Sequence, residues 1–143
     1  MGTTVVAAVL KNDTLITAHV GDSRAYLVSD GLYQITKDHS LVQELVDSGE
    51  LTRDEAKTYP YKNVITRALG INEHIEIDFT ERKINSNDRI LLCSDGLSNF
   101  VSEENLYHIT ADNEVTETAV LLVNEANNNG GGDNVTAVVF SEQ

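Results

Sequence analysis

Three short segments of the sequence place an aspartate beside a glycine: Gly21-Asp22-Ser23-Arg24, Ser94-Asp95-Gly96 and Gly132-Asp133-Asn134. Each lies where a strand-like run meets a turn, and the glycine lets the backbone bend sharply without a Cβ. Aspartates from several strand ends can converge on one point, and such carboxylates hold hard ions such as Mg²⁺ or Mn²⁺. These ions turn bound water into a nucleophile near neutral pH and stabilise phosphoryl displacement. The three segments therefore indicate a metal site.

Each segment taken alone is also typical of an ordinary turn, because Asp and Gly favour turns in any protein. Asp95 differs from the other two because it follows the apolar run Ile90-Leu91-Leu92-Cys93. That run places its carboxylate near the interior, where an unpartnered charge is costly. Asp95 is therefore harder to interpret as an ordinary turn residue than the other two aspartates.

The first forty residues alternate in the pattern of β-strands. Strands are expected over residues 3–10, 14–20, 24–29 and 32–36, with turns at Asn12-Asp13 and Asp30-Gly31. Sequential strands joined by short turns indicate an antiparallel meander.

Helical and strand-like segments then follow one another along the chain. A helix is expected from residue 41 to Gly49, and a second after the capping-box pattern at Thr52, ending before Pro60. Further strands are expected over 75–80, 89–94 and 135–140, and further helices over 102–109 and 115–127. The predicted class is α+β, with mostly antiparallel strands and helices packed on a face.

Composition limits the possible partners. The chain has 143 residues, 41% of them hydrophobic, which is enough for one domain with a core. Ten basic against 23 acidic residues give a net charge of −13, which disfavours nucleic acid and anionic membranes. A single cysteine, Cys93, and no apolar run of about 18 residues indicate a cytoplasmic protein without membrane insertion.

Six stretches in order together carry a family resemblance, although each is weak alone. They are Met1-Gly2-Thr3-Thr4, Val20-Gly21-Asp22-Ser23-Arg24-Ala25-Tyr26, Lys37-Asp38-His39-Ser40, Asn63-Val64-Ile65-Thr66-Arg67-Ala68-Leu69-Gly70, Leu91-Leu92-Cys93-Ser94-Asp95-Gly96-Leu97 and Gly131-Gly132-Asp133-Asn134-Val135-Thr136. In this order the chain resembles the C-terminal part of a bacterial metal-dependent protein serine/threonine phosphatase of the 2C type.

The resemblance implies an antiparallel β-sandwich flanked by helices, with two or three Mn²⁺ or Mg²⁺ ions at one end. Asp95 and Asp133 would be ligands of the metal pair, and Asp22 would help to hold a third ion together with Asp95. Metal-bound hydroxide would attack phosphoserine or phosphothreonine without a phosphoenzyme. The stretch of about residues 41–61 would be a flap beside the active site. Phosphorylated proteins, a Ser/Thr kinase among them, would be the partners.

Two segments of the family pattern do not occur in this sequence: an Arg-x-x-Asn-Glu-Asp segment and an Asp-Gly-x-Gly-Gly segment. In the family they supply a bridging metal ligand and an arginine that grips phosphate. We therefore expect residues 1–143 to be a partial domain that lacks the first strands, with Met1 an internal methionine of a longer enzyme. Unpaired sheet edges or exposed apolar sheet faces are expected to favour self-association.

Two other functions remain open at this stage. A catalytically incomplete fragment or relative would act as a partner-binding module, and a simple divalent-ion-binding domain would bind metal without hydrolysis. Arg24 is interpreted as a salt-bridge partner within the sandwich. His39 is interpreted as a structural residue, with general acid as the alternative. His19 is interpreted as a packed histidine whose ring nitrogens are both satisfied.

Overall fold

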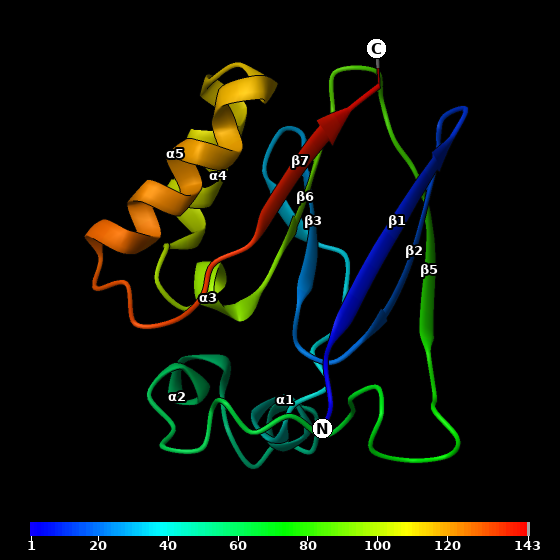
Figure 1. Ribbon diagram of the computed structural model, residues 1–143, viewed down its shortest axis with the longest axis vertical. Coiled ribbons are helices and arrows are strands. Elements are labelled where there is room, and N and C mark those ends of the chain that lie inside the picture. Colours follow the sequence, from blue (N-terminus) through cyan, green and yellow to red (C-terminus); the bar gives the residue numbers. More distant parts are fainter. Residues whose placement is uncertain (143) are drawn as a thin grey trace.

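The computed structural model describes residues 1–142, which form two antiparallel sheets that face each other (Figure 1). The first sheet has the order β1 (Val5–Lys11), β2 (Thr14–Val20), β5 (Asp78–Lys83). The second has the order β4 (Leu32–Gln34), β3 (Arg24–Val28), β6 (Arg89–Cys93), β7 (Ala137–Ser141). Every pairing is antiparallel, which confirms the expected α+β sandwich.

The helices cover one side and one end of the sandwich. Helices α4 (Glu103–Asp112) and α5 (Val115–Asn128) lie on the outer face of the second sheet (Figure 1). Helices α1 (Leu41–Asp47) and α2 (Arg53–Lys57) lie together below one end of the sandwich, where the short α3 (Asp95–Ser98) also lies (Figure 1). Among the described residues, none of these helices has the length and apolarity that a membrane span requires.

Strands β3 and β6 have apolar side chains on both faces because both faces are buried. Leu27 and Ile90 point between the two sheets, together with Leu15 of β2. Tyr26 and Leu91 point the other way, into a larger cluster with residues of α3, α4 and α5. A strand that is covered on both sides reads as a continuous apolar run, which explains the sequence that precedes Asp95.

The outer face of the first sheet is apolar and exposed. Val9 is 61% exposed and Phe79 69% exposed, and Val5 and Ile16 are also exposed on the same sheet. Within residues 1–142, α4 and α5 lie on the other side of the sandwich and α1 to α3 lie at one end, so this face is left without cover (Figure 1). The expected exposed apolar sheet face is thus confirmed.

Strand β5 begins later than the sequence pattern predicts. The alternation of Ile75, Ile77 and Phe79 favours a strand over 75–80, whereas β5 spans Asp78–Lys83. Its pairing with β2 starts at Asp78, opposite His19, because β2 ends just beyond this point. Residues 75–77 have no strand left to pair with, and both isoleucines are exposed.

Candidate metal centre

The strand register gathers the three candidate aspartates at one end of the second sheet. Arg24 at the start of β3 pairs with Cys93 at the end of β6, and Cys93 pairs with Ala137 at the start of β7. Asp22, Asp95 and Asp133 lie only a few residues outside these aligned positions. Antiparallel pairing therefore places all three at the same end of the sheet, which is the end nearest α1 and α2 (Figure 1).

Asp22 lies in the tight turn between β2 and β3. Gly21 has φ +109°, a conformation that side chains other than glycine rarely adopt, and a Cβ there would lie 2.4 Å from Thr4 Cγ2. The hydroxyl oxygens of Thr4 and Ser23 lie 2.9 Å apart and tie the turn to the chain before β1. The carboxylate of Asp22 is consequently presented by a closely packed turn.

Asp95 begins α3 directly after β6. Thr136 N–H donates to Ser94 Oγ at 3.0 Å, and Ser94 N–H donates to the Thr136 carbonyl at 3.1 Å. A Cβ at position 96 would lie 2.0 Å from the Asn134 carbonyl oxygen, so glycine is required where the two segments cross. This close crossing places Asp95 against the loop that carries Asp133.

Burial and neighbouring negative charge raise the pKa values of Asp22 and Asp95. Burial raises the pKa of Asp22 to about 6, with further increases from the negative charges of Asp95 and Asp38. Burial also raises the pKa of Asp95, and the charge of Asp133 adds to that increase. Aspartates that resist ionisation through burial and like charge are stabilised by a bound cation. Oxygen donors of this kind fit Mg²⁺ or Mn²⁺.

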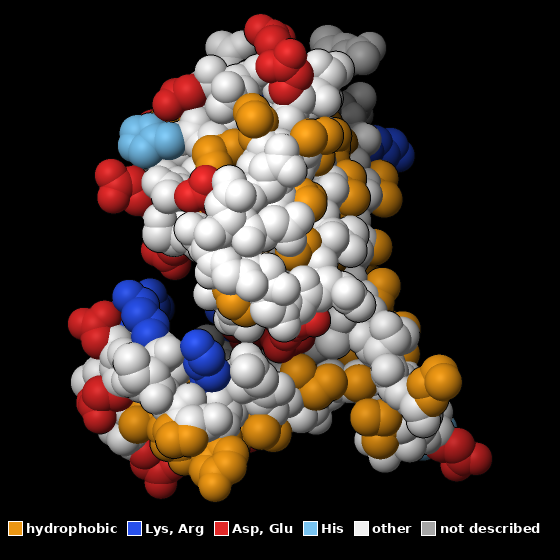
Figure 2. All heavy atoms as spheres, turned by 60° about the vertical axis from the view of Figure 1, so that its left-hand side comes forward, with side chains coloured by type: hydrophobic (Ala, Val, Ile, Leu, Met, Phe, Trp, Pro, Cys, Tyr) orange, Lys and Arg blue, Asp and Glu red, His pale blue; other side chains and the backbone are white. Residues whose placement is uncertain are grey.

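Asp95 and Asp133 line a shared hollow of about 240 Å³. Its other lining residues come from α3, the loop before β7 and the loop after α2: Asn99, Phe100, Gly132, Lys62 and Asn63. Figure 2 shows a cleft between the lower part of the molecule and the main body, with basic side chains on its lower side and acidic side chains opposite. Asp22 does not line this hollow. It interacts with Asp95, which does, through the repulsion between their two negative charges.

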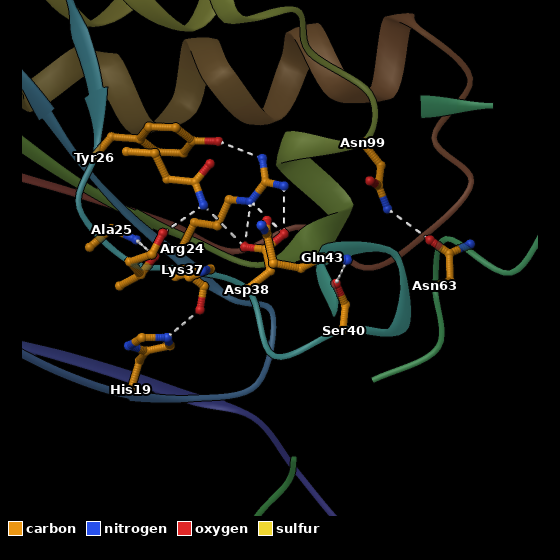
Figure 3. A network of polar contacts seen from close by, with 12 residues as sticks. His19, Arg24, Ala25, Tyr26, Lys37, Asp38, Ser40, Gln43, Asn63 and Asn99 are labelled. Atoms are coloured by element: carbon orange, nitrogen blue, oxygen red, sulfur yellow. Dashed lines mark hydrogen bonds and ion pairs between the residues drawn. The ribbon is translucent and has the colours of Figure 1, made fainter. Parts of the chain in front are cut away.

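Lys62 was missed by the sequence analysis, although it lines the hollow. Its loop has no motif that distinguishes it from an ordinary surface lysine. The loop is held near α3 by a 3.3 Å hydrogen bond from Asn99 Nδ2 to Asn63 Oδ1, drawn in Figure 3. Lys62 thereby brings a positive charge to the rim of an otherwise acidic site.

A second group of possible metal ligands lies nearby: His19, His39 and Asp78. Among the described residues, this is the group of three whose ligand atoms all lie within 4.8 Å of one another, and Asp22, Asp95 and Asp133 do not approach each other so closely. The two imidazole rings are stacked, with centroids 4.5 Å apart and planes 17° apart. Ring lone pairs lie in the ring plane, so stacked rings do not aim them at a common ion. Both rings are buried and packed, as the structural interpretation expects, but His19 is not fully satisfied, because among the described residues its Nδ1 has no hydrogen-bond partner.

Arg24 forms a two-pronged ion pair with Asp38 beside the site. Its Nη2 donates to Asp38 Oδ2 at 2.6 Å and its Nε donates to Oδ1 at 2.9 Å (Figure 3). Nη1 donates to the hydroxyl oxygen of Tyr26 at 2.9 Å. The expected salt bridge within the sandwich is therefore confirmed, and the guanidinium also lowers the cost of ionising Asp22 and Asp95.

Sequence and fold comparisons give the same family. The model of the family described as "Protein phosphatase 2C" matches residues 1–53. The serine/threonine phosphatase stp of Listeria innocua is 41% identical over 141 residues, which is 97% of this chain. The crystal structure of the serine/threonine phosphatase PstP/Ppp of Mycobacterium tuberculosis superimposes on the whole chain with a TM-score of 0.93 and 45% identity. The chain belongs to the protein phosphatase 2C family.

The match is to part of each related phosphatase. The chain spans 56% of the Listeria phosphatase and 61% of the Mycobacterium structure. A structure of the catalytic domain of the serine/threonine protein phosphatase PstP, described in complex with two manganese ions, matches 97% of this chain with a TM-score of 0.86 and 45% identity. Membership of the protein phosphatase 2C family thus agrees with the acidic, oxygen-rich site described above.

Proposed function

We propose that the protein containing this chain is a metal-dependent phosphatase that hydrolyses phosphoserine and phosphothreonine in proteins. The observation that carries this proposal is the shared hollow of Asp95 and Asp133, two close carboxylates with a lysine on the rim. The manganese ions of the related PstP catalytic domain support Mn²⁺ or Mg²⁺ as the cofactor. Residues 1–143 would form part of the catalytic domain, in a protein that acts in the cytoplasm.

The residues of this chain would act as follows. Asp95 and Asp133 would hold the metal pair, and Asp22 would contribute to a further ion with Asp95. When bound, the ions supply an activated water and neutralise charge on the phosphoryl group. Lys62 would attract a phosphate oxygen at the mouth of the hollow, because its ammonium group is exposed there. Residues 41–61, which include α1 and α2, would form the flap beside the cleft.

The proposed substrates are phosphorylated proteins, and a Ser/Thr kinase is a proposed partner. A folded phosphoprotein would present its phosphorylated residue to the cleft in Figure 2 through an exposed segment. The phosphate, rather than neighbouring side chains, would supply most of the recognition, because the hollow is small. The enzyme would accordingly reverse phosphorylation by Ser/Thr kinases.

Hydrolysis of p-nitrophenyl phosphate by the full-length protein with Mn²⁺ tests this proposal. Asp95→Asn should abolish turnover, while Asp112→Asn on the exposed side of α4 should leave it unchanged. Mn²⁺ binding by the wild type is measured in parallel. Turnover by the Asp95→Asn variant at the wild-type rate would contradict the assignment of the site.

The exposed sheet face supports a second candidate, a partner-binding module. Val9 and Phe79 belong to an apolar face that monomeric proteins rarely leave open. A full-length protein that binds Mn²⁺ but never hydrolyses a phosphate ester, and that associates through this face, would favour the module over the enzyme. Substituting Phe79 by Glu and measuring the molecular mass by light scattering identifies such association.

A further inference from the structure

We propose that His39 is a positioning residue that fixes the turn carrying Asp22, and that Asp78 fixes His39 in turn. This inference rests on the proposed function, because it takes Asp22 as a metal ligand. It assigns the buried histidine neither metal binding nor proton transfer. Its role is to hold a carboxylate where an ion can use it.

His39 holds both polar groups of the Gly21 backbone. Gly21 N–H donates to His39 Nδ1 at 3.0 Å, and His39 N–H donates to the Gly21 carbonyl at 3.0 Å. Gly21 has unusual conformational freedom, and its N–H and carbonyl face no strand partner at this turn. Two hydrogen bonds from one residue remove that freedom. Asp22 follows directly, so its direction depends on this clamp.

The hydrogen bonds determine the tautomer of His39. Since Nδ1 accepts from Gly21, it carries no proton in the neutral ring, and Nε2 carries the proton. Nε2 then donates to Asp78 Oδ2 at 2.8 Å. Arg67 Nη1 lies 3.2 Å from the same nitrogen, but it also donates to Asp78 Oδ1 at 2.9 Å. Two donors do not bond each other, so both converge on Asp78.

Packing holds the ring of His39 in the same orientation. The ring is 5% exposed and stacks on His19. His19 is itself fixed by a 2.8 Å hydrogen bond from Nε2 to the Lys37 carbonyl, shown in Figure 3. A carboxylate–histidine pair of this kind orients metal ligands in many proteins when the histidine itself binds the metal. Here the Asp78–His39 pair orients the proposed ligand Asp22 indirectly, through the backbone of Gly21.

A double-mutant cycle in the full-length protein tests the proposal, with the affinity for Mn²⁺ measured from the spin-resonance signal of the free ion. In the His39→Gln variant the side chain can reach Asp78, but it places no hydrogen-bond acceptor where Nδ1 lies in the wild type. We expect this variant to bind one Mn²⁺ ion about tenfold more weakly. His39→Asn places its amide oxygen at the Nδ1 position and should stay within about threefold of the wild type. His74→Gln, at an exposed histidine, is the matched control.

The cycle separates positioning from stability. Asp22→Asn should remove the same ion, and adding His39→Gln to Asp22→Asn should cause no further loss, because both changes act through one ligand. If the two losses are independent, or if Asp22→Asn leaves Mn²⁺ binding unchanged, the proposal is wrong. Should His39→Gln not fold, Asp78→Asn takes its place in the cycle. Asp95→Asn tests the proposed function separately, since its failure to affect binding or hydrolysis would overturn the metal centre itself.

Discussion

Replacing Asp22 with asparagine should stabilise the metal-free protein at neutral pH. The pKa of Asp22 is raised from 3.8 to about 6 by burial and by the charges of Asp95 and Asp38. The folded state therefore favours the protonated form, and the contribution of Asp22 to stability falls as the pH rises from about 4 to about 6. The full pKa shift corresponds to about 3 kcal/mol in the free energy of unfolding. Because the carboxylate is partly exposed, solvent screening reduces this cost to about 1 kcal/mol. The neutral amide of the Asp22→Asn variant avoids that cost.

Thermal unfolding of the full-length protein, followed by circular dichroism, measures this effect. In EDTA at pH 7 we expect Asp22→Asn to raise Tm by about 3 °C, with the gain shrinking toward pH 4. In saturating Mn²⁺ the sign should reverse, because the variant has lost a ligand. Asp47→Asn is the matched control, since its hydrogen bond from Lys37 lowers the pKa of this carboxyl and its removal should give no gain. A metal-free Asp22→Asn protein no more stable than the wild type at pH 7 would refute the reasoning.

Three further substitutions probe the loops and the core. Gly96→Ala puts a Cβ 2.0 Å from the Asn134 carbonyl oxygen, and urea denaturation should show a loss of about 1–3 kcal/mol. Lys62→Gln should raise KM for a phosphopeptide about two- to fivefold and leave Tm unchanged. Arg53→Gln on α2 is the control and should leave KM unchanged. Equal KM values for the two variants would show that Lys62 does not contact the substrate. Leu122→Ala empties a fully buried position under the second sheet and should cost about 2–5 kcal/mol in the same urea assay.

Much of the architecture follows from local patterns. The alternating strands, the capping box at Thr52 and the apolar run before Asp95 each predict an element that the structure contains. The three aspartates at strand ends predict a common site, and the register of β3, β6 and β7 brings them to one end of the sheet, where Asp95 and Asp133 share a hollow that Asp22 does not line. These signals succeed because burial on one or both faces determines residue type directly.

Other features depend on contacts between distant segments and leave no local pattern. The helix Asp95–Ser98 reads as a turn, since Gly96 is a poor helix former and is required only by the passing Asn134 backbone. The start of β5 is determined by the end of β2. Likewise, His39 and Gly21 are 18 positions apart, and a hydrogen bond between a side chain and a distant backbone group has no recognisable spacing.

The buried thiol of Cys93 makes the end of the sandwich that carries Asp95 accessible to measurement by chemical modification. This residue is the single cysteine of the chain, is 2% exposed and lies two positions before Asp95. Burial raises its pKa to about 12, so an alkylating reagent reacts only when the end of β6 separates from its neighbouring strands. The rate of alkylation therefore reports how often this end of the sheet opens. Ions that join Asp95 to its neighbours would slow that opening, and slower alkylation of Cys93 in the purified protein would therefore report their binding.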